Sequence, residues 1–182
     1  MFYAPRVSAL DEEAPGSPSL WGLVEAAARL RPDDVLLADD HGRSLTSSAF
    51  RRAAERAAAG LVELDVQPGD VVAWQLPTTL EAAVLMAACA RLGVVQSPLI
   101  PVLREREVGF IVDQVGAALI VVPETWRGYA HGEMARALGP KVLALDLEGP
   151  PGPGLRLPAG SAGLPPAGLP PAATDASADC RW

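Results

Sequence analysis

The stretch from Val66 to Phe110 constrains the fold more than any other part of this chain. It opens with the turn residues Pro68-Gly69, and an almost continuous apolar run follows from Val71 to Leu76. Such a run is typical of a parallel strand that is covered on both faces. The remainder predicts a helix, a second strand over Val94 to Ser97 and, after two prolines, the start of another helix.

The helix in this stretch has sequence signals at both ends. Thr78 is predicted to be its N-cap, with Glu81 reaching back to complete a capping box. Gly93 is predicted to end it as the left-handed residue after the last turn. Because the helix is apolar nearly all round, we expect it to be buried.

Two further helices and a β-hairpin are predicted before this stretch. Ser17-Pro18 signals the start of the first helix, as an N-cap followed by proline. Short strands are predicted over Val35 to Ala38 and Arg43 to Leu45. Thr46 is predicted to cap the next helix, whose apolar stripe consists of Phe50, Ala54, Ala57, Leu61 and Leu64.

Helices and strands also alternate after the stretch. The pattern predicts helices over Arg104 to Gly116 and His131 to Leu138, and strands over Ala118 to Val122 and Lys141 to Leu145. Strands that alternate with helices of this length imply βαβ units. We therefore expect an α/β fold with a mostly parallel sheet of about five strands flanked by helices, and the strand from Arg43 as an extra hairpin arm.

The composition changes after Leu147. Fourteen of the 23 residues from 149 to 171 are Gly or Pro, and such a segment cannot supply the hydrogen bonds of a helix or a central strand. We therefore predict a flexible N-terminus over residues 1–17, an α/β domain over residues 18–148 and a Pro/Gly-rich linker or disordered tail over residues 149–182.

Charge and cysteine content exclude several classes of protein. The net charge is −7 and no basic cluster is present, which argues against nucleic-acid binding and anionic membrane surfaces. The N-terminus does not resemble a signal peptide, and the longest apolar run, Ala82 to Ala90, is too short to cross a bilayer. Cys89 fits a core position and Cys180 a position without function, so we expect a reduced, cytoplasmic setting.

Few residues are candidates for chemistry. The chain lacks GxGxxG, GxxxxGK[ST], GxSxG and HExxH motifs and has only two histidines. His41 is interpreted as a solvated turn residue and His131 as a surface residue at a helix start. Asp39-Asp40 could suggest a metal site, but a turn explains the pair better. Asp11-Glu12-Glu13 is interpreted as a solvated charge run.

The segment Arg104-Glu105-Arg106-Glu107 is the most notable charged group. Its arginines could contact a phosphate at a helix start, but its alternating charges favour a solvated first turn. Trp74 and Trp126 are interpreted as packing residues rather than ligand platforms. We therefore assign no catalytic, cofactor-binding or metal-binding residue from the sequence.

Several motifs resemble the adenylate-forming enzymes, that is, the AMP-dependent synthetases and ligases. Leu45-Thr46 at a helix start resembles their first core motif. Pro68 to Ala73, followed by Leu76-Pro77, resembles the next stretch of their N-terminal domain. Arg91 to Val95 resembles their second core motif. The resemblance covers about Leu20 to Leu147.

Three other segments resemble one branch of that family. Pro98 to Pro101, Arg104 to Ile111 and Trp126 to Tyr129 look like the short- to medium-chain fatty acid and cyclohexanecarboxylate CoA ligases. Asp179 to Trp182 resembles the lead-in to the family's next strand. The resemblance therefore implies the N-terminal part of an acyl-CoA synthetase.

The resemblance also implies a chemistry. The family uses ATP and Mg²⁺ to convert a carboxylic acid into an acyl-adenylate and pyrophosphate, and CoA thiol then displaces AMP. The family's phosphate-binding loop, metal ligand, ribose-binding aspartate and C-terminal lysine all follow the position that matches Trp182. We therefore expect this chain alone to be inactive and to bind ATP, Mg²⁺ and CoA only weakly.

Three alternatives remain open. The chain could belong to another adenylate-forming branch, such as an aryl-CoA ligase or a peptide-synthetase adenylation domain. It could be a flavodoxin-like binding module, although Leu76-Pro77 and Ser97-Pro98 stand where such a module needs acidic or Gly-rich strand ends. It could also be a poorly folding, non-catalytic remnant. An exposed sheet edge makes self-association a further expectation.

Overall fold

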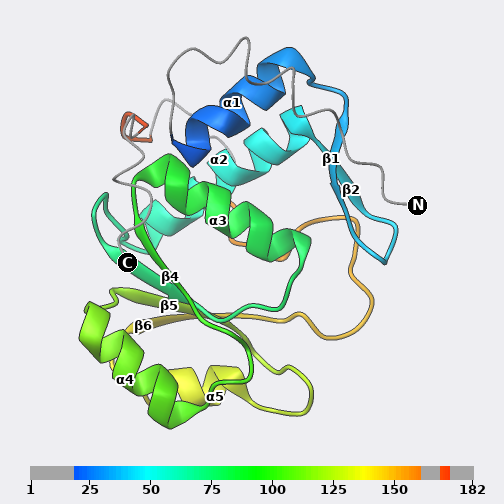
Figure 1. Ribbon diagram of the computed structural model, residues 1–182. Helices are drawn as coiled ribbons and strands as arrows, with labels where there is room; N and C mark the ends of the chain where they lie inside the picture. The colour runs from blue at the N-terminus through cyan, green and yellow to red at the C-terminus, as the bar shows by residue number, and fades with distance from the viewer. Residues whose placement is uncertain (1–18, 161–168, 173–182) are drawn as a thin grey trace.

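The structure is a computed structural model that describes residues 19–160 and 169–172 (Figure 1). The helices are α1 (Leu20–Leu30), α2 (Ser47–Glu63), α3 (Leu80–Leu92), α4 (Glu105–Val115) and α5 (His131–Arg136). The strands are β1 (Val35–Ala38), β2 (Ser44–Thr46), β3 (Val71–Trp74), β4 (Val95–Pro98), β5 (Leu119–Pro123) and β6 (Lys141–Leu145). No helix in this part of the chain combines the length and the apolar character needed to cross a membrane.

The main sheet has four parallel strands in the order β4-β3-β5-β6. Helices α1, α2 and α3 lie on one face, and α4 and α5 lie on the other (Figure 1). This arrangement confirms the predicted α/β fold. The sheet has one strand fewer than expected, because Val35–Ala38 pairs only with Ser44–Thr46 in a separate antiparallel hairpin.

The two central strands separate two hydrophobic cores. Val72, Leu119 and Val121 belong to the larger core under α1, α2 and α3. The residues that alternate with them, Ala73, Ile120 and Val122, belong to the smaller core under α4 and α5. Because every position of β5 is buried, its sequence shows an apolar run instead of an alternating pattern.

The starts of two helices differ from the prediction by one or two residues. The first helix is capped by Ser19, whose hydroxyl accepts a hydrogen bond from the Gly22 amide at 3.0 Å. The prediction of Ser17 was therefore wrong, and Ser17 itself lies outside the described residues. The third helix is capped by Thr79 instead of Thr78. Glu81 is therefore the second residue after the cap and not the third, and it does not form the predicted capping box.

Other predicted helix ends are confirmed. The Thr46 hydroxyl accepts a hydrogen bond from the Ala49 amide at 3.3 Å and caps α2. Gly93 ends α3 with a φ of 73°, a left-handed conformation in which glycine avoids the strain of a Cβ atom.

Residues 149–160 contain no helix or strand and pack against the helices of the larger core. The Gly160 amide donates to the Arg56 carbonyl at 3.1 Å. A Cβ atom at Gly60 would lie only 2.6 Å from the Pro158 carbonyl oxygen, so the two backbones approach closely. The flexible N-terminus over 1–17 and the linker or disordered tail over 149–182 stay predictions, since residues 1–18, 161–168 and 173–182 lie outside the described part.

Adjacent residues of α3 provide a test of the packing. Leu85 is 1% exposed in the larger core, whereas Met86 is 37% exposed. Leu85→Ala is expected to lower the free energy of unfolding by about 3 kcal/mol, because it removes buried methyl groups and leaves a cavity. Met86→Ala is expected to lower it by less than about 1 kcal/mol. Urea unfolding of both variants gives the comparison, and equal losses would contradict the described orientation of α3.

Candidate functional site

His131 is completely buried, so the prediction of a surface residue was wrong. Its Nδ1 lies 3.0 Å from the Tyr129 carbonyl oxygen, and its Nε2 lies 3.0 Å from the Pro101 carbonyl oxygen. Edge-on contacts with the rings of Trp126 and Tyr129 enclose the imidazole. His131 therefore joins the loop after β4 to the loop after β5, a contact between distant residues that the local sequence does not reveal.

Arg104 holds the loop that precedes α4. Its Nη1 donates to the carbonyl oxygens of Pro101 and Leu103, each at 3.0 Å. The guanidinium lies 4.1 Å from the centre of the Tyr129 ring, and the Arg104 amide donates to the Glu107 carboxylate at 3.3 Å. These contacts are internal to the fold, and they do not favour the phosphate-binding interpretation of residues 104–107.

The Asp39-Asp40-His41 segment forms the turn of the β1–β2 hairpin. The Asp39 carboxylate accepts hydrogen bonds from the amides of His41 at 3.1 Å and Arg43 at 2.8 Å. The side chain of Asp40 is 93% exposed, and His41 is also exposed. The geometry is that of a turn closed by an aspartate side chain.

A buried network around Glu81 was not found by sequence reasoning. Arg43 makes a bidentate contact with the Glu81 carboxylate, with N–O distances of 2.8 and 3.2 Å. Arg43 Nε also donates to Asp39 Oδ2 at 2.7 Å, and the Arg156 amide donates to Glu81 at 3.4 Å. Glu81, which is only 1% exposed, therefore connects α3 to the β1–β2 hairpin and to residues 149–160.

The network favours the ionised forms of its members. Burial alone would raise the pKa of Glu81, but the hydrogen bonds and charge of Arg43, together with backbone amides, lower it below its usual value. Burial would likewise raise the pKa of Asp39, and its contacts with Arg43 lower it. The hydrogen bond to Glu81 raises the pKa of Arg43. These carboxylates serve as acceptors within the fold, a structural role.

One sequence signal could have indicated this network. Glu81 is the only acidic residue of α3, which is otherwise almost entirely apolar. A charge in a buried helix needs a partner of opposite charge, because an unpaired buried carboxylate is very unfavourable. The sequence could therefore have predicted that Glu81 has a partner, although not that Arg43, 38 residues earlier, provides it.

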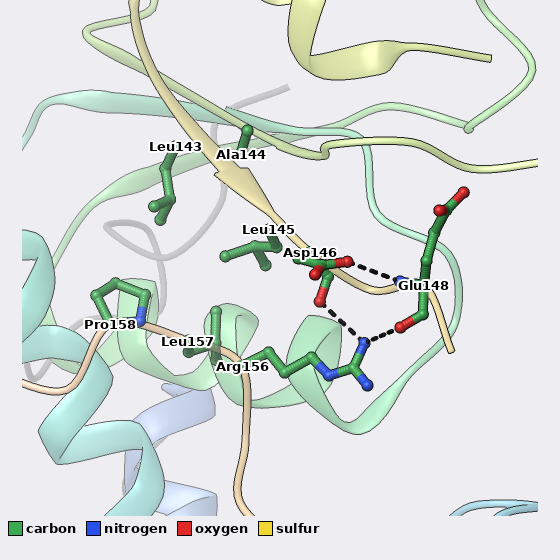
Figure 2. A pocket seen from close by; sticks show the side chains of 8 residues that line it. All are labelled: Leu143, Ala144, Leu145, Asp146, Glu148, Arg156, Leu157 and Pro158. Carbon is green, nitrogen blue, oxygen red and sulfur yellow. Dashed lines mark hydrogen bonds between the residues drawn. The ribbon is translucent and has the colours of Figure 1, made fainter. Parts of the chain in front are cut away.

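Two hollows adjoin the network. A small pocket of about 60 Å³ lies between Arg43, Glu81 and Arg156, and a larger groove of about 610 Å³ lies beside β6 (Figure 2). Arg156 projects along this groove, and its Nη1 donates to the carbonyl oxygens of Asp146 and Glu148, each at 2.9 Å. The groove is lined by Leu143, Ala144, Leu145, Asp146, Glu148, Arg156, Leu157 and Pro158.

The remaining candidates from the sequence are packing residues where they are described. Cys89 is fully buried in α3, and burial raises the pKa of its thiol to about 12. Trp74 packs against the larger core. Trp126 pairs with Tyr129 across a turn. Asp11-Glu12-Glu13 and Cys180 lie outside the described residues.

The described residues do not fit the nucleotide and metal expected of the resembling family. No group of three His, Cys, Asp or Glu side chains that could hold a metal gathers within residues 19–160 and 169–172. Nucleotides bind open α/β sheets at the carboxyl ends of the strands. There, Gln75 Nε2 donates to the carbonyl oxygens of Ile100 at 2.9 Å and Leu103 at 3.0 Å, so both N–H groups of this side chain are used within the fold. We assign no chemical step to these residues.

The network predicts a loss of stability in Glu81→Gln. Removing the charge leaves Arg43 buried without its bidentate partner, which is expected to lower the free energy of unfolding by about 3 kcal/mol at pH 7. Glu25→Gln, at an exposed position of α1, is the control and is expected to change it by less than about 0.5 kcal/mol. Denaturant unfolding measures both, and equal effects would contradict a structural role for Glu81.

The stability difference between the native chain and Glu81→Gln is expected to depend on pH. The pKa of Glu81 is lower in the folded chain than its usual 4.5, so its stabilising contribution is complete above pH 4.5 and is lost as the pH falls through the folded value. The difference in unfolding free energy between the native chain and Glu81→Gln should therefore shrink below pH 4.5. A difference that stays constant down to pH 3, about 1.5 units lower, would contradict the lowered pKa.

Comparisons with known proteins relate this fold to a family. The sequence profile of the AMP-binding enzyme family matches residues 24–160. The chain is 33% identical over 112 residues to the medium-chain fatty-acid–CoA ligase of Escherichia coli strain K12, which covers 62% of this chain and 20% of that ligase. It is 36% identical over 109 residues to the 2-hydroxy-7-methoxy-5-methyl-1-naphthoate–CoA ligase of Streptomyces carzinostaticus, covering 60% of this chain and 19% of that enzyme.

A solved structure shares the fold. The o-succinylbenzoate coenzyme A synthetase of Bacillus subtilis, in complex with AMP, superimposes with a TM-score of 0.60 at 20% identity, over 69% of this chain and 31% of that chain. The chain spans about a fifth of the length of the curated relatives described above. The profile match covers most of the chain and confirms the family predicted from its motifs: the chain belongs to the AMP-binding enzyme family.

Proposed function

We propose that this chain provides the N-terminal α/β part of an enzyme that activates a carboxylic acid for transfer to CoA. In this reaction ATP and the acid give an acyl-adenylate and pyrophosphate, and the CoA thiol then displaces AMP to form a thioester. The observation that carries the proposal is the family match over residues 24–160. The 33% identity to a medium-chain fatty-acid–CoA ligase supports activation of a carboxylic acid for transfer to CoA.

The proposed contribution of the chain is a scaffold. Acyl-adenylate formation requires positive charge and hydrogen-bond donors around the transferring phosphate groups. The donors at the strand ends of this chain, on Gln75, Arg104 and His131, already contact carbonyl oxygens in the loop after β4. We therefore propose that the chain alone forms no acyl-CoA and binds ATP, Mg²⁺ and CoA weakly.

The proposed substrate is an aliphatic carboxylic acid of short or medium length. The segments that resemble this branch, Pro98 to Pro101 and Arg104 to Ile111, lie in the loop after β4 and in α4. An aromatic acid is the second candidate, since the naphthoate–CoA ligase is 36% identical over a similar length. We place this activity in the reduced cytoplasm, without a nucleic-acid partner.

A chimera tests this role. The matching N-terminal segment of the Escherichia coli medium-chain ligase is replaced by this chain, and CoA thioester formation is measured with one aliphatic and one aromatic acid. We expect the chimera to retain activity on the aliphatic acid within about ten-fold of the parent ligase, equivalent to about 1.4 kcal/mol of barrier. This chain alone, assayed in parallel, is expected to give no thioester above background.

Each arm of the experiment has an outcome that contradicts the proposal. A chimera that unfolds cooperatively yet forms no thioester would overturn the scaffold role. Preference for the aromatic acid, in a chimera whose parent prefers the aliphatic one, would favour the second candidate. ATP-dependent thioester formation by the chain alone would show that it is active without further segments.

A further inference from the structure

The two edges of the parallel sheet differ in their ability to pair with another strand. At the β4 edge, the amide of Val95 donates inward to the carbonyl of Asp70, just before β3, at 2.9 Å, and the amide of Leu99 donates to the carbonyl of Trp74 at 2.8 Å. Because successive residues of a strand alternate in direction, Gln96 and Pro98 point outward. Pro98 has no amide hydrogen, so this edge offers little to an incoming strand.

The β6 edge has a full set of backbone groups. The Lys141 amide donates inward to Ala118 at 3.2 Å, and the Leu145 carbonyl accepts inward from Glu124 at 2.7 Å. The alternate residues Val142 and Ala144 therefore direct both their N–H and C=O groups away from β5. Both are only half-buried, and β6 pairs with β5 alone among the described strands. This is the edge that can accept another strand.

Residues 149–160 return beside this same edge. Figure 2 shows Arg156, Leu157 and Pro158 facing β6 across the groove of about 610 Å³. The backbone groups of Asp146, like those of Val142 and Ala144, point away from β5. The Asp146 carbonyl oxygen accepts a hydrogen bond from Arg156 at 2.9 Å. The returning segment therefore occupies the carboxyl end of the β6 edge.

Contacts of Arg156 and Pro158 hold the segment in place. The Arg156 amide donates to the buried Glu81 carboxylate. The Arg156 guanidinium also donates to the Pro150 carbonyl at 2.9 Å. Two residues after Arg156, the backbone at Pro158 passes so close to α2 that only glycine fits at position 60. These contacts involve α2, α3 and the end of β6, so they fix the segment across the larger core.

We propose that residues 149–160 are a strap that guards the outer edge of β6, and that release of the strap lets β6 pair with β6 of a second copy of this chain. Val142 and Ala144 lie symmetrically about Leu143. In an antiparallel pair, Val142 therefore stands opposite Ala144 of the second copy, and each such pair exchanges both backbone hydrogen bonds. This inference concerns assembly and does not depend on the proposed ligase function.

Charge favours a second copy as the occupant. β6 begins at Lys141, whose ammonium lies 3.0 Å from Asp65 in an exposed ion pair, and the exposed acidic residues Asp146 and Glu148 follow its end. An antiparallel copy places the basic start of each strand beside the acidic end of the other. A parallel strand of the same charge pattern would place like charges together, which is unfavourable.

The test uses the full chain with two strap variants that act by different means. Gly60→Ala places a methyl group 2.6 Å from the Pro158 carbonyl and forces the strap away, while alanine suits a helix better than glycine. R156K replaces the guanidinium, which donates to four carbonyl oxygens, by a single ammonium group. Trypsin still cleaves after a lysine, so the same bond can be followed in this variant. Gly109→Ala is the control, because its methyl group meets only the flexible end of Leu138.

Two measurements follow on each protein. Tryptic cleavage of the bond between positions 156 and 157 is expected to become about ten-fold faster in both strap variants, because it tracks the population of released strap. Sedimentation velocity is expected to show concentration-dependent dimers for both, and monomers for the native chain and the Gly109→Ala control. Unchanged cleavage and an unchanged monomer in both strap variants would overturn the proposal.

An edge variant separates β6 pairing from other association. Gly60→Ala combined with Ala144→Pro lacks the outward amide of residue 144 and is expected to be cleaved rapidly but to stay monomeric. If this double variant fails to fold, hydrogen exchange of Gly60→Ala decides the question. Protection of the Val142 and Ala144 amides should then increase with protein concentration. Dimers that form without such protection, or that persist in the folded double variant, would overturn pairing through β6.

Discussion

Burial of β3 and β5 on both faces is the constraint on which the rest of this structure depends. Alternate residues of these strands belong to different cores, so both faces of the sheet require helices. Parallel neighbours also need long connections, and three of the helices that cover the sheet, α3, α4 and α5, lie in those connections. Among the described strands, the order β4-β3-β5-β6 leaves the two outer ones with one neighbour each, so the edges must be protected by other means.

Much of this fold could be predicted from the sequence, because its signals are local. The apolar run from Val71 specified a central strand, and Thr46 and Gly93 marked helix ends through their own backbone and side-chain chemistry. Thr78 and Thr79 could not be distinguished, since both are good caps and the choice depends on where the chain leaves β3. The hairpin was placed correctly in sequence, but its separation from the main sheet depends on packing that no local pattern records.

The polar interior was much harder to predict. His131 contacts the Pro101 carbonyl across 30 residues, and Arg43 contacts Glu81 across 38. Both contacts join segments that are distant in sequence and are brought together by the tertiary fold. Buried polar side chains also need partners, so the lone acidic residue of α3 was a usable clue whereas the histidine gave none. The sequence therefore drew attention to Glu81, interpreted as part of a capping box, but it did not reveal the network that this residue forms.

The Glu81–Arg43 pair has a consequence for the orientation of α3 that is separate from its contribution to stability. A helix that is apolar on nearly every side can bury several of its faces about equally well. Its amphipathicity therefore says little about its rotation around its own axis. The carboxylate near its first turn meets the Arg43 guanidinium of the hairpin, and this contact restricts the rotation of the helix. The pair thus constrains the angular position of the most buried helix in the described chain, and with it which small residues face α2 and which face the sheet.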